Sequence, residues 1–456
     1  MPRTALLIAL LLAGCQDLPT DPDPPEGRAA LSGSPNVLLI LTDDQRYDDA
    51  AYMPLTRDRI GGHGTTFSHA VATTSLCCPA RVSILRGQYA HNHKVRDNTL
   101  PLGGFDVARQ LGIEQSTVAT WLHDAGYRTA LFGKYLNAYD IGSAADRAYI
   151  PPGWDWWYIP EPRYNVDRVA INGAIRTIPT TYHTVVLFAS ARTWIKQQPG
   201  AWFAAVWLRA PHDLAVPAQR HRGMFAGWPP PRPPSFNVPT GVAGYQTEPF
   251  SDLQLVALNR MYRERLETLQ AVDEGIAATI DSLAAWGQLD NTLVIFTSDN
   301  GYAVGEHALE GKNYPYAESY RVPLMIRGPG VVAEVSDELV GHLDLAPTIA
   351  DFAGVPSASF VDGRSLRPIL EGAGPPWRTA ILIEHWRAPA NQSVLRANKI
   401  YTEWQGGQKA YYDLAADPYQ TRNLWGVVSP GSLKKFLLPL KTCVAAGCRA
   451  ADMGVW

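Results

Sequence analysis

Residues 36–44 read Asn36-Val37-Leu38-Leu39-Ile40-Leu41-Thr42-Asp43-Asp44. After Asn36 the run is apolar up to Leu41, which is typical of a strand buried on both faces of an α/β sheet. Residues 128–132, 202–208 and 292–297 have a similar character, whereas residues 251–286 show the spacing of a core-facing helix. Strands of this kind combined with helices predict an α/β fold.

Oxygen-bearing side chains follow two of these predicted strands. Asp43 and Asp44 come after the first, and Asp299 and Asn300 come after the strand at residues 292–297. Ligand sites of open α/β sheets lie at the carboxyl ends of strands. Carboxylate and amide oxygens suit Ca²⁺ or Mg²⁺ rather than a soft metal. An Asp-Asp pair is also common in solvated turns that cap helices, but the position at strand ends favours a divalent metal.

Two adjacent cysteines precede a predicted helix in residues 75–87, which read Ser75-Leu76-Cys77-Cys78-Pro79-Ala80-Arg81-Val82-Ser83-Ile84-Leu85-Arg86-Gly87. Backbone N–H groups and the dipole at a helix N-terminus favour negative charge, so an oxyanion can bind there. A buried structural cysteine beside a helix start gives the same local pattern. The residues alone leave both interpretations open.

The segment from Cys77 to Arg81 resembles the C-x-P-x-R signature of the type I sulfatases, and residues 87–93 continue the similarity. In that family a formylglycine-generating enzyme oxidises the first cysteine after translation. The resemblance implies that Cys77 is the precursor of formylglycine and that Cys78 is the variable position. One hydroxyl of the aldehyde hydrate would attack sulfur, and the other would later expel sulfate.

Further motifs extend the resemblance over nearly the whole chain from Asn36 onward. They resemble the sulfatase T-D-D and S-D-N-G segments, a G-K pair in which Leu136 replaces the usual histidine two residues after the lysine, an A-P-H segment, and a second G-K followed by R-V-P. The resemblance implies metal ligands at Asp43, Asp44, Cys77, Asp299 and Asn300. It implies catalytic roles for Cys77, Arg81, Lys134, His212 and Lys312.

The implied roles follow from charge and proton transfer. Arg81, about one helical turn from Cys77, would stabilise the hydrate, and Lys134 and Lys312 would offset charge on the transferring group. Either His212 or Lys312 would protonate the departing alcohol. Taken singly, such a histidine is also typical of a structural role and such a lysine of a solvated surface. Ca²⁺ is the expected metal, with Mg²⁺ as the alternative.

The chain resembles bacterial arylsulfatases and, at residues 134–137 and 149–154, N-acetylglucosamine-6-sulfatases. This implies hydrolysis of a sulfate monoester on a sulfated sugar, such as N-acetylglucosamine-6-sulfate, or on an aryl sulfate. The alternatives are a phosphate monoester or diester hydrolase of the same superfamily, and a non-catalytic, lipid-anchored glycan-binding protein.

The resemblance also implies an alkaline phosphatase-like fold, with a large mixed sheet flanked by helices and a smaller antiparallel C-terminal subdomain. We expect the catalytic domain at residues 36–373 and an α+β subdomain at residues 374–456. Short alternating segments predict strands at residues 380–385, 393–396, 399–404 and 410–414.

The N-terminus predicts export. Arg3, an apolar run at residues 5–12 and Cys15 are typical of a signal peptide over residues 1–15, of the lipoprotein type or a plain secretory type. Residues 16–35 are proline-rich and acidic, which predicts a disordered tether. The expected location is the periplasm or, through a lipid anchor, the bacterial outer membrane.

The remaining cysteines and histidines have weaker signals. With Cys15 and Cys77 assigned, Cys443 and Cys448 are expected to form a small disulfide rather than a metal pair, and Cys78 a buried thiol. Candidate pocket residues are His91, His93, Asp97 and Asn98, and His307 has either a structural or an active-site role. The formal charge of −3, from 40 basic and 43 acidic residues, is not that of a nucleic-acid-binding protein.

Overall fold

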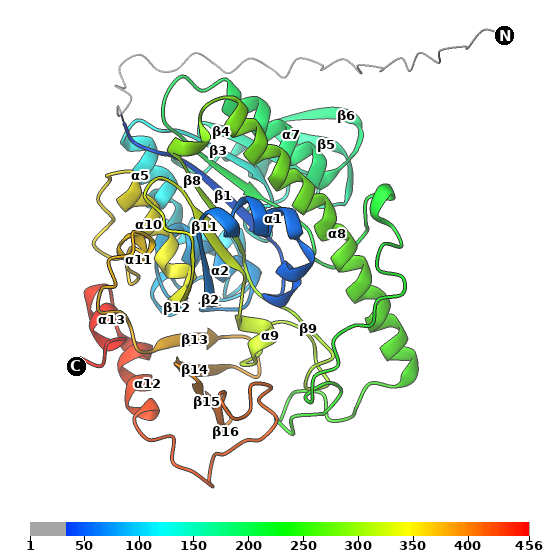
Figure 1. Cartoon of the computed structure of the whole chain (residues 1–456), viewed down its shortest axis with the longest axis vertical. Helices are drawn as coiled ribbons and strands as arrows, with labels where there is room; N and C mark the ends of the chain where they lie inside the picture. The colour runs from blue at the N-terminus through cyan, green and yellow to red at the C-terminus, as the bar shows by residue number, and fades with distance from the viewer. Residues whose placement is uncertain (1–32, 456) are drawn as a thin grey trace, which may run out of the picture.

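The computed structural model describes residues 33–455. A ten-stranded sheet runs through the centre in the order β12-β2-β11-β8-β1-β7-β3-β4-β5-β6 (Figure 1). The strands are β1 (Asn36–Thr42), β2 (Thr65–Val71), β3 (Arg128–Gly133), β4 (Trp156–Pro160), β5 (Asn165–Ile171), β6 (Ala174–Tyr182), β7 (Trp202–Trp207), β8 (Thr292–Ser298), β11 (Leu324–Arg327) and β12 (Glu334–Gly341).

The sheet is mixed. β1 pairs in parallel with β7 and β8, whereas β11 runs antiparallel to β8 and β2, and β5 runs antiparallel to β4 and β6. The predicted signal peptide, and the predicted tether up to residue 32, lie outside the described residues. Within residues 33–455, no helix combines the length and the apolar character needed to cross a membrane.

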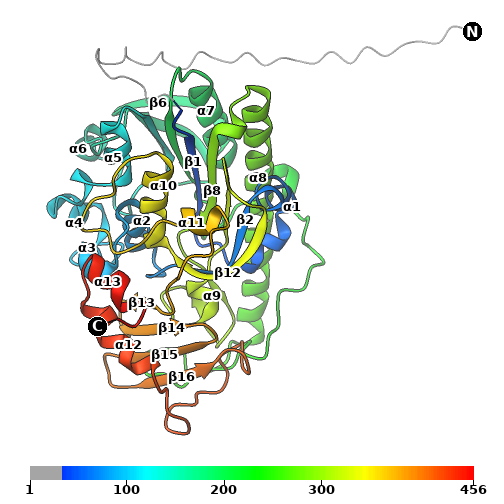
Figure 2. The same ribbon diagram turned by 60° about the vertical axis from the view of Figure 1, so that its left-hand side comes forward.

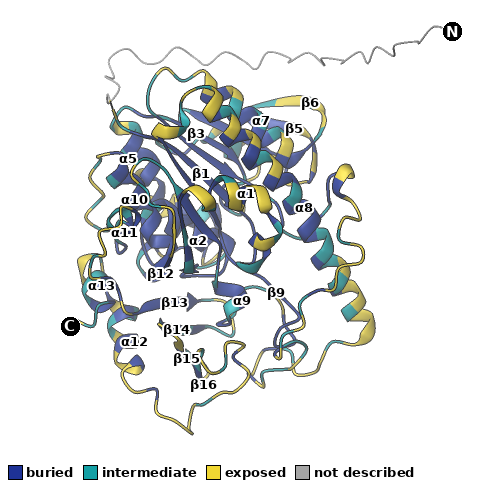
Figure 3. Cartoon of the chain, in the orientation of Figure 1, coloured by how far each residue is buried: buried dark blue, intermediate teal, exposed yellow. Residues whose placement is uncertain are grey.

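Helices cover both faces of the sheet because alternate residues of the central strands point in opposite directions. Val37, Leu39 and Leu41 pack on one face, and Leu38 and Ile40 on the other. The central strands β1 and β8 are buried along their whole length (Figure 3). The first face carries α2 (Cys77–Arg86), α4 (Gly104–Gln110), α5 (Val118–Asp124), α10 (Leu345–Phe352) and α11 (Arg367–Leu370). On the second face lie α1 (Pro54–Arg59), α7 (His183–Lys196) and α8 (Asp252–Ala285).

Helix α8 is 34 residues long and begins at a capping box formed by Ser251 and Gln254. Its buried stripe has the spacing of three and four residues that the sequence predicts. Three charged side chains lie buried among the apolar ones of α8, namely Arg265, Glu267 and Asp273, and the exposure of Arg265 is 0%. A fully buried arginine requires partners, which the site below supplies.

A four-stranded antiparallel sheet forms the C-terminal region next to the large sheet (Figure 2). Its elements are β13 (Ile381–His385), β14 (Asn391–Arg396), β15 (Lys399–Trp404), β16 (Lys409–Asp413), α12 (Leu433–Thr442) and α13 (Ala446–Ala451). The short elements elsewhere are α3 (Ala90–His93), α6 (Ala144–Ala148), α9 (Ala317–Tyr320), β9 (Ala303–Val304) and β10 (Glu310–Gly311). The α/β class, the mixed sheet and the smaller antiparallel sheet are confirmed; the domain boundary at residue 373 stays a prediction.

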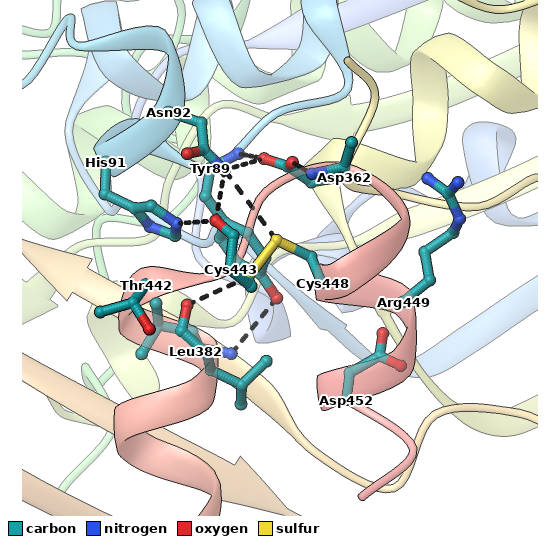
Figure 4. The surroundings of a disulfide bond; sticks show 12 residues. Tyr89, His91, Asn92, Asp362, Leu382, Thr442, Cys443, Cys448, Arg449 and Asp452 are labelled. Carbon is teal, nitrogen blue, oxygen red and sulfur yellow. Dashed lines mark hydrogen bonds between the residues drawn. A yellow bond between two sulfur atoms is a disulfide. The ribbon is translucent and has the colours of Figure 1, made fainter. Parts of the chain in front are cut away.

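The disulfide between Cys443 and Cys448 joins α12 to α13, as the sequence predicts. Figure 4 shows its surroundings: His91 contacts the carbonyl oxygen of Cys443 at 3.0 Å, and Asn92 donates to the same oxygen at 3.0 Å. The disulfide segment is therefore held against α3 of the large domain. Cys78 is a buried free thiol, which is also confirmed.

Candidate active site

The predicted metal ligands lie together because β1 and β8 are neighbours. The two strands are parallel and place Thr42 opposite Ser298, so the residues that follow each strand emerge at the same edge of the sheet. Asp43, Asp44, Asp299 and Asn300 are all buried there, with exposures of 0–1%. The three carboxylates therefore lie close together away from water.

These side chains fit a divalent cation. One ligand atom from each of Asp43, Asp44, Asp299 and Cys77 lies within 4.8 Å of the others. Asn300 donates from Nδ2 to Asp44 Oδ1 at 2.7 Å, but its Oδ1 is buried without a hydrogen-bond partner. Because an unsatisfied buried acceptor is costly, this oxygen is suited to bind a cation. An oxygen-rich donor set of this kind fits Ca²⁺ or Mg²⁺.

Cys77 is the first residue of α2 and is fully buried beside this cluster. Its Sγ lies 3.3 Å from Asp43 Oδ1 and 2.7 Å from Lys312 Nζ. Burial, and next the charge of Asp43, raise the pKa of the Cys77 thiol well above its ordinary value. The unmodified thiol is therefore protonated and a poor nucleophile.

Three cations surround the carboxylates. Arg81 Nε donates to Asp299 Oδ2 at 2.9 Å, and Lys134 Nζ donates to Asp43 Oδ2 at 2.5 Å. Lys312 Nζ contacts Asp44 Oδ1 as well as Cys77.

The charges at this centre stabilise one another. Burial would lower the pKa of Lys312, but Asp44, and next Cys77, raise it well above the ordinary value. Burial would raise the pKa of Asp43, but Lys134 and other cations hold it well below the ordinary value. Lys312 and Asp43 thus stay charged in a buried setting, whereas burial, and next the charge of Asp43, raise the pKa of Asp299.

His212 lies at the open side of this cluster, with a side-chain exposure of 29%. Its Nδ1 lies 2.5 Å from the carbonyl oxygen of Asp213. Since a carbonyl only accepts, Nδ1 carries a proton, and Nε2 lies 3.8 Å from Asp44 Oδ2. Nε2 is thus the nitrogen available for proton transfer at this centre.

A cavity of about 790 Å³ opens above the cluster and reaches Asp44, His212 and Lys312. A cavity of this size can enclose much of a sugar. Its other polar lining residues include Asn98, Tyr245, Gln246, Tyr302, Glu310 and Arg387.

Among the four candidate pocket residues, only Asn98 lines this cavity. The prediction is wrong for His91, which contacts Glu384 Oε1 at 2.9 Å in addition to Cys443. It is also wrong for His93, whose Nε2 lies 3.1 Å from Ser83 Oγ. Both histidines lie in α3, which packs toward the C-terminal region rather than toward the cavity. Asp97 does not line the cavity either, and its Oδ2 lies 3.8 Å from Arg387 Nε.

His307 lies among aromatic side chains. Its ring stacks on Tyr316 with ring centroids 3.8 Å apart, and burial lowers its pKa to about 4. This environment favours the structural interpretation of His307.

Sequence reasoning missed Arg265, Asp213 and Tyr302, which contact one another beside the cluster. Arg265 has a usable signal in the sequence, because it occupies an apolar-stripe position of a long helix. Asp213 and Tyr302 carry no comparable signal, since each is an ordinary polar residue next to a motif. The residues with predicted catalytic and metal-binding roles are all brought together at one centre.

The family model for sulfatases matches residues 35–355. The chain belongs to the sulfatase family. A second model, N-sulphoglucosamine sulphohydrolase C-terminal, matches residues 305–438 of this sulfatase. Membership makes the protein a sulfuric ester hydrolase, and the sheet described above is the alkaline phosphatase-like fold of sulfatases.

Individual relatives support this assignment. The sulfatase is 32% identical to human (Homo sapiens) N-acetylglucosamine-6-sulfatase, in a match covering 97% of this chain and 90% of the human one. It is 35% identical to the extracellular sulfatase SULF-1 homolog of Drosophila melanogaster, but spans only 32% of that longer protein and 76% of itself. A solved structure in complex with its substrate D-glucosamine-2-N,6-O-disulfate superposes with a TM-score of 0.75 at 23% identity, covering 90% of this chain and 97% of that one.

Proposed function

We propose that this sulfatase hydrolyses a sulfate monoester on an amino sugar such as N-acetylglucosamine-6-sulfate. The names of the human relative and of the ligand in the solved structure support this substrate class. The observation that carries the proposal is the position of Cys77. Its Sγ lies 3.3 Å from Asp43 and 2.7 Å from Lys312, beside a sugar-sized cavity.

The nucleophile is the hydrate of a formylglycine made from Cys77. A separate formylglycine-generating enzyme and an external oxidant would convert the Cys77 side chain to an aldehyde with loss of its sulfur. One hydroxyl oxygen of the hydrate then bonds to the sulfate sulfur while the bond to the sugar oxygen breaks. The second hydroxyl loses its proton, sulfate leaves, and the aldehyde forms again. Addition of water restores the hydrate.

The surrounding side chains support both steps. Lys312, next to Cys77 Sγ, and Lys134, next to Asp43, place positive charge where the transferring sulfate gains negative charge. Arg81 is held by Asp299 within the first turns of α2 and would contact the hydrate. These charges are fixed before substrate binds, which is what makes them effective.

The departing sugar oxygen requires a proton. His212 presents Nε2 to this centre, whereas the ammonium of Lys312 is bound to Asp44 and Cys77. We propose His212, in its protonated form, as the acid, since Lys312 is held in place by its two partners. In its neutral form the same nitrogen can accept the proton of the second hydroxyl.

Asp43, Asp44, Asp299 and Asn300 would hold a divalent metal together with formylglycine 77, and Ca²⁺ is the proposed ion, with Mg²⁺ as the alternative. When bound, the metal polarises sulfate oxygens and lowers the pKa of the hydrate. The residues that hold it also keep the nucleophile in place through the contact between position 77 and Asp43.

Export is part of the proposal. The disulfide between Cys443 and Cys448 is typical of an oxidising compartment, and two relatives carry the words extracellular sulfatase in their names. The periplasm, or the outer membrane through lipidated Cys15, remains the proposed location.

Two measurements test the proposal. Mass spectrometry of the peptide containing residue 77, from an active preparation, is expected to show the aldehyde in place of the thiol; an unmodified cysteine would exclude this mechanism and would favour a binding protein if activity were also absent. Sulfate and phosphate esters of N-acetylglucosamine are then compared as substrates. A higher kcat/KM for phosphate monoesters or diesters would reject the sulfatase assignment.

A further inference from the structure

Arg265 is a fully buried arginine on the inner face of α8. Its Nη2 donates to the backbone carbonyl oxygen of Asp44, and its Nη1 lies 3.1 Å from Asp213 Oδ1. The guanidinium also lies over the ring of Tyr302, 4.0 Å from the centroid. These three partners of the Arg265 side chain all lie outside its own helix.

Each partner belongs to a different loop of the active site. Asp44 follows β1 and is itself a proposed metal ligand, whereas Asp213 follows β7 and adjoins His212. Tyr302 comes two residues after Asn300, and its hydroxyl donates to Asp213 Oδ2. One side chain from α8 thus connects the ends of three neighbouring strands, β7, β1 and β8.

The contact with Arg265 helps to hold the unusual backbone conformation of Asp44. Its φ of 69° lies in the left-handed region, which a non-glycine residue adopts only when the surroundings hold it there. The Asp44 N–H donates to Asp299 Oδ1 at 3.1 Å, and its carbonyl accepts from Arg265. Both backbone groups of Asp44 are therefore held by side chains, which fixes the direction of its carboxylate.

The second contact acts on His212. The carboxylate of Asp213 is held by Arg265 and Tyr302, while the carbonyl of the same residue accepts from His212 Nδ1. Holding Asp213 in place therefore holds the imidazole orientation and its tautomer. We propose that Arg265 is a positioning residue, which sets the direction of the Asp44 carboxylate toward the metal and of His212 toward the substrate.

This inference rests on the metal site and acid of the proposed function. A purely structural arginine would behave differently, because removing one partner of a buried ion pair lowers the free energy of unfolding but leaves the metal affinity and kcat of the folded enzyme unchanged. Measurements of metal affinity and kcat well below the unfolding temperature therefore distinguish a positioning role of Arg265 from a purely structural one.

The test compares Arg265→Met and Arg265→Lys with the wild type and with Arg260→Met. Arg260 lies on the exposed side of α8, and its Nε pairs with Glu264 Oε1 of the same helix at 2.9 Å, so its variant controls for loss of an arginine from α8. Ca²⁺ is titrated calorimetrically into metal-free protein, and kcat and KM are measured on N-acetylglucosamine-6-sulfate with saturating Ca²⁺.

We expect Arg265→Met to weaken Ca²⁺ binding 10- to 100-fold, as is usual for residues that orient metal ligands, and to lower kcat more than it changes KM. Arg265→Lys should be intermediate, because one ammonium cannot reach both acceptors as the guanidinium fork does. Arg260→Met should match the wild type. Unchanged Ca²⁺ affinity and kcat in Arg265→Met would overturn the inference.

Two further variants keep the test decisive if Arg265→Met fails to fold. Tyr302→Phe removes the hydroxyl that donates to Asp213 Oδ2. Asp213→Asn weakens the contact with Arg265, and because the Asp213 side chain is 30% exposed, water can solvate the new amide. Each should lower kcat several-fold without a shift in unfolding temperature; wild-type kcat in both would refute the positioning role. A wild type that binds neither Ca²⁺ nor Mg²⁺ would instead refute the metal site of the proposed function.

Discussion

Replacing Lys312 with methionine removes one charge and leaves a side chain of similar length. Lys312 Nζ lies 2.7 Å from Cys77 Sγ, the position where the nucleophile is proposed to form. At that distance, an effective dielectric constant of about 20 gives about 6 kcal/mol between unit charges. If about half a charge develops in the transition state, the Lys312→Met variant loses about 3 kcal/mol of transition-state stabilisation. That corresponds to a decrease in kcat of about 100-fold, similar to the loss of one oxyanion-hole donor.

The assay measures sulfate release from N-acetylglucosamine-6-sulfate at saturating substrate, by ion chromatography. Lys196→Met is the matched control, since Lys196 is exposed at the end of α7. Metal content is determined in the same samples, because Lys312 also contacts Asp44. A kcat within threefold of the wild type, with metal and aldehyde both present, would show that Lys312 does not stabilise the transition state electrostatically.

Three further predictions concern the metal, the disulfide and a buried carboxyl group. Removal of metal by a chelator should abolish activity, and Ca²⁺ should restore it; full activity in metal-free protein would exclude a catalytic metal. Replacing both Cys443 and Cys448 with serine should lower the free energy of unfolding by about 2 kcal/mol for so short a loop, while Ca²⁺ affinity, measured by titration, stays unchanged. Burial, and next Glu306, raise the pKa of Glu318 to about 8, so the folded state holds a proton that the unfolded state releases near pH 4.5. Wild-type stability should therefore fall as pH rises from about 5 to 8, and urea unfolding of Glu318→Gln should show a smaller decrease; equal slopes would contradict the raised pKa.

Much of the fold can be predicted from the sequence because its signals are local. The apolar run before Asp43 forms β1, the runs before Arg209 and Asp299 form β7 and β8, and the strands of the C-terminal sheet lie within two residues of the predicted positions. Strands β2, β11 and β12 lack such signals. β2 and β12, near the sheet edge, contain partly or fully exposed residues among the buried ones, and β11 is only four residues long.

Some residues of the candidate site could likewise be predicted from the sequence, and others could not. A position at strand ends pointed to the carboxylates, and resemblance to the sulfatase motifs pointed to Cys77 and to both lysines. Sequence reasoning placed His91 wrongly, since the contact of that histidine with Glu384 depends on how the C-terminal sheet packs against α3. It also missed Arg265, whose partners lie at least 37 residues away along the chain and become neighbours only when α8 covers the sheet.

The sequence by itself determined which side chains this sulfatase can use: hard oxygen ligands at strand ends, a cysteine at a helix N-terminus, and cations to balance them. The tertiary structure decided how these groups meet. Parallel pairing of β1 with β8 places Asp43 beside Asp299, and α2 packs so that Cys77 Sγ lies 3.3 Å from Asp43. Distances of this kind depend on contacts between segments far apart in the chain, and local periodicity carries no information about those contacts.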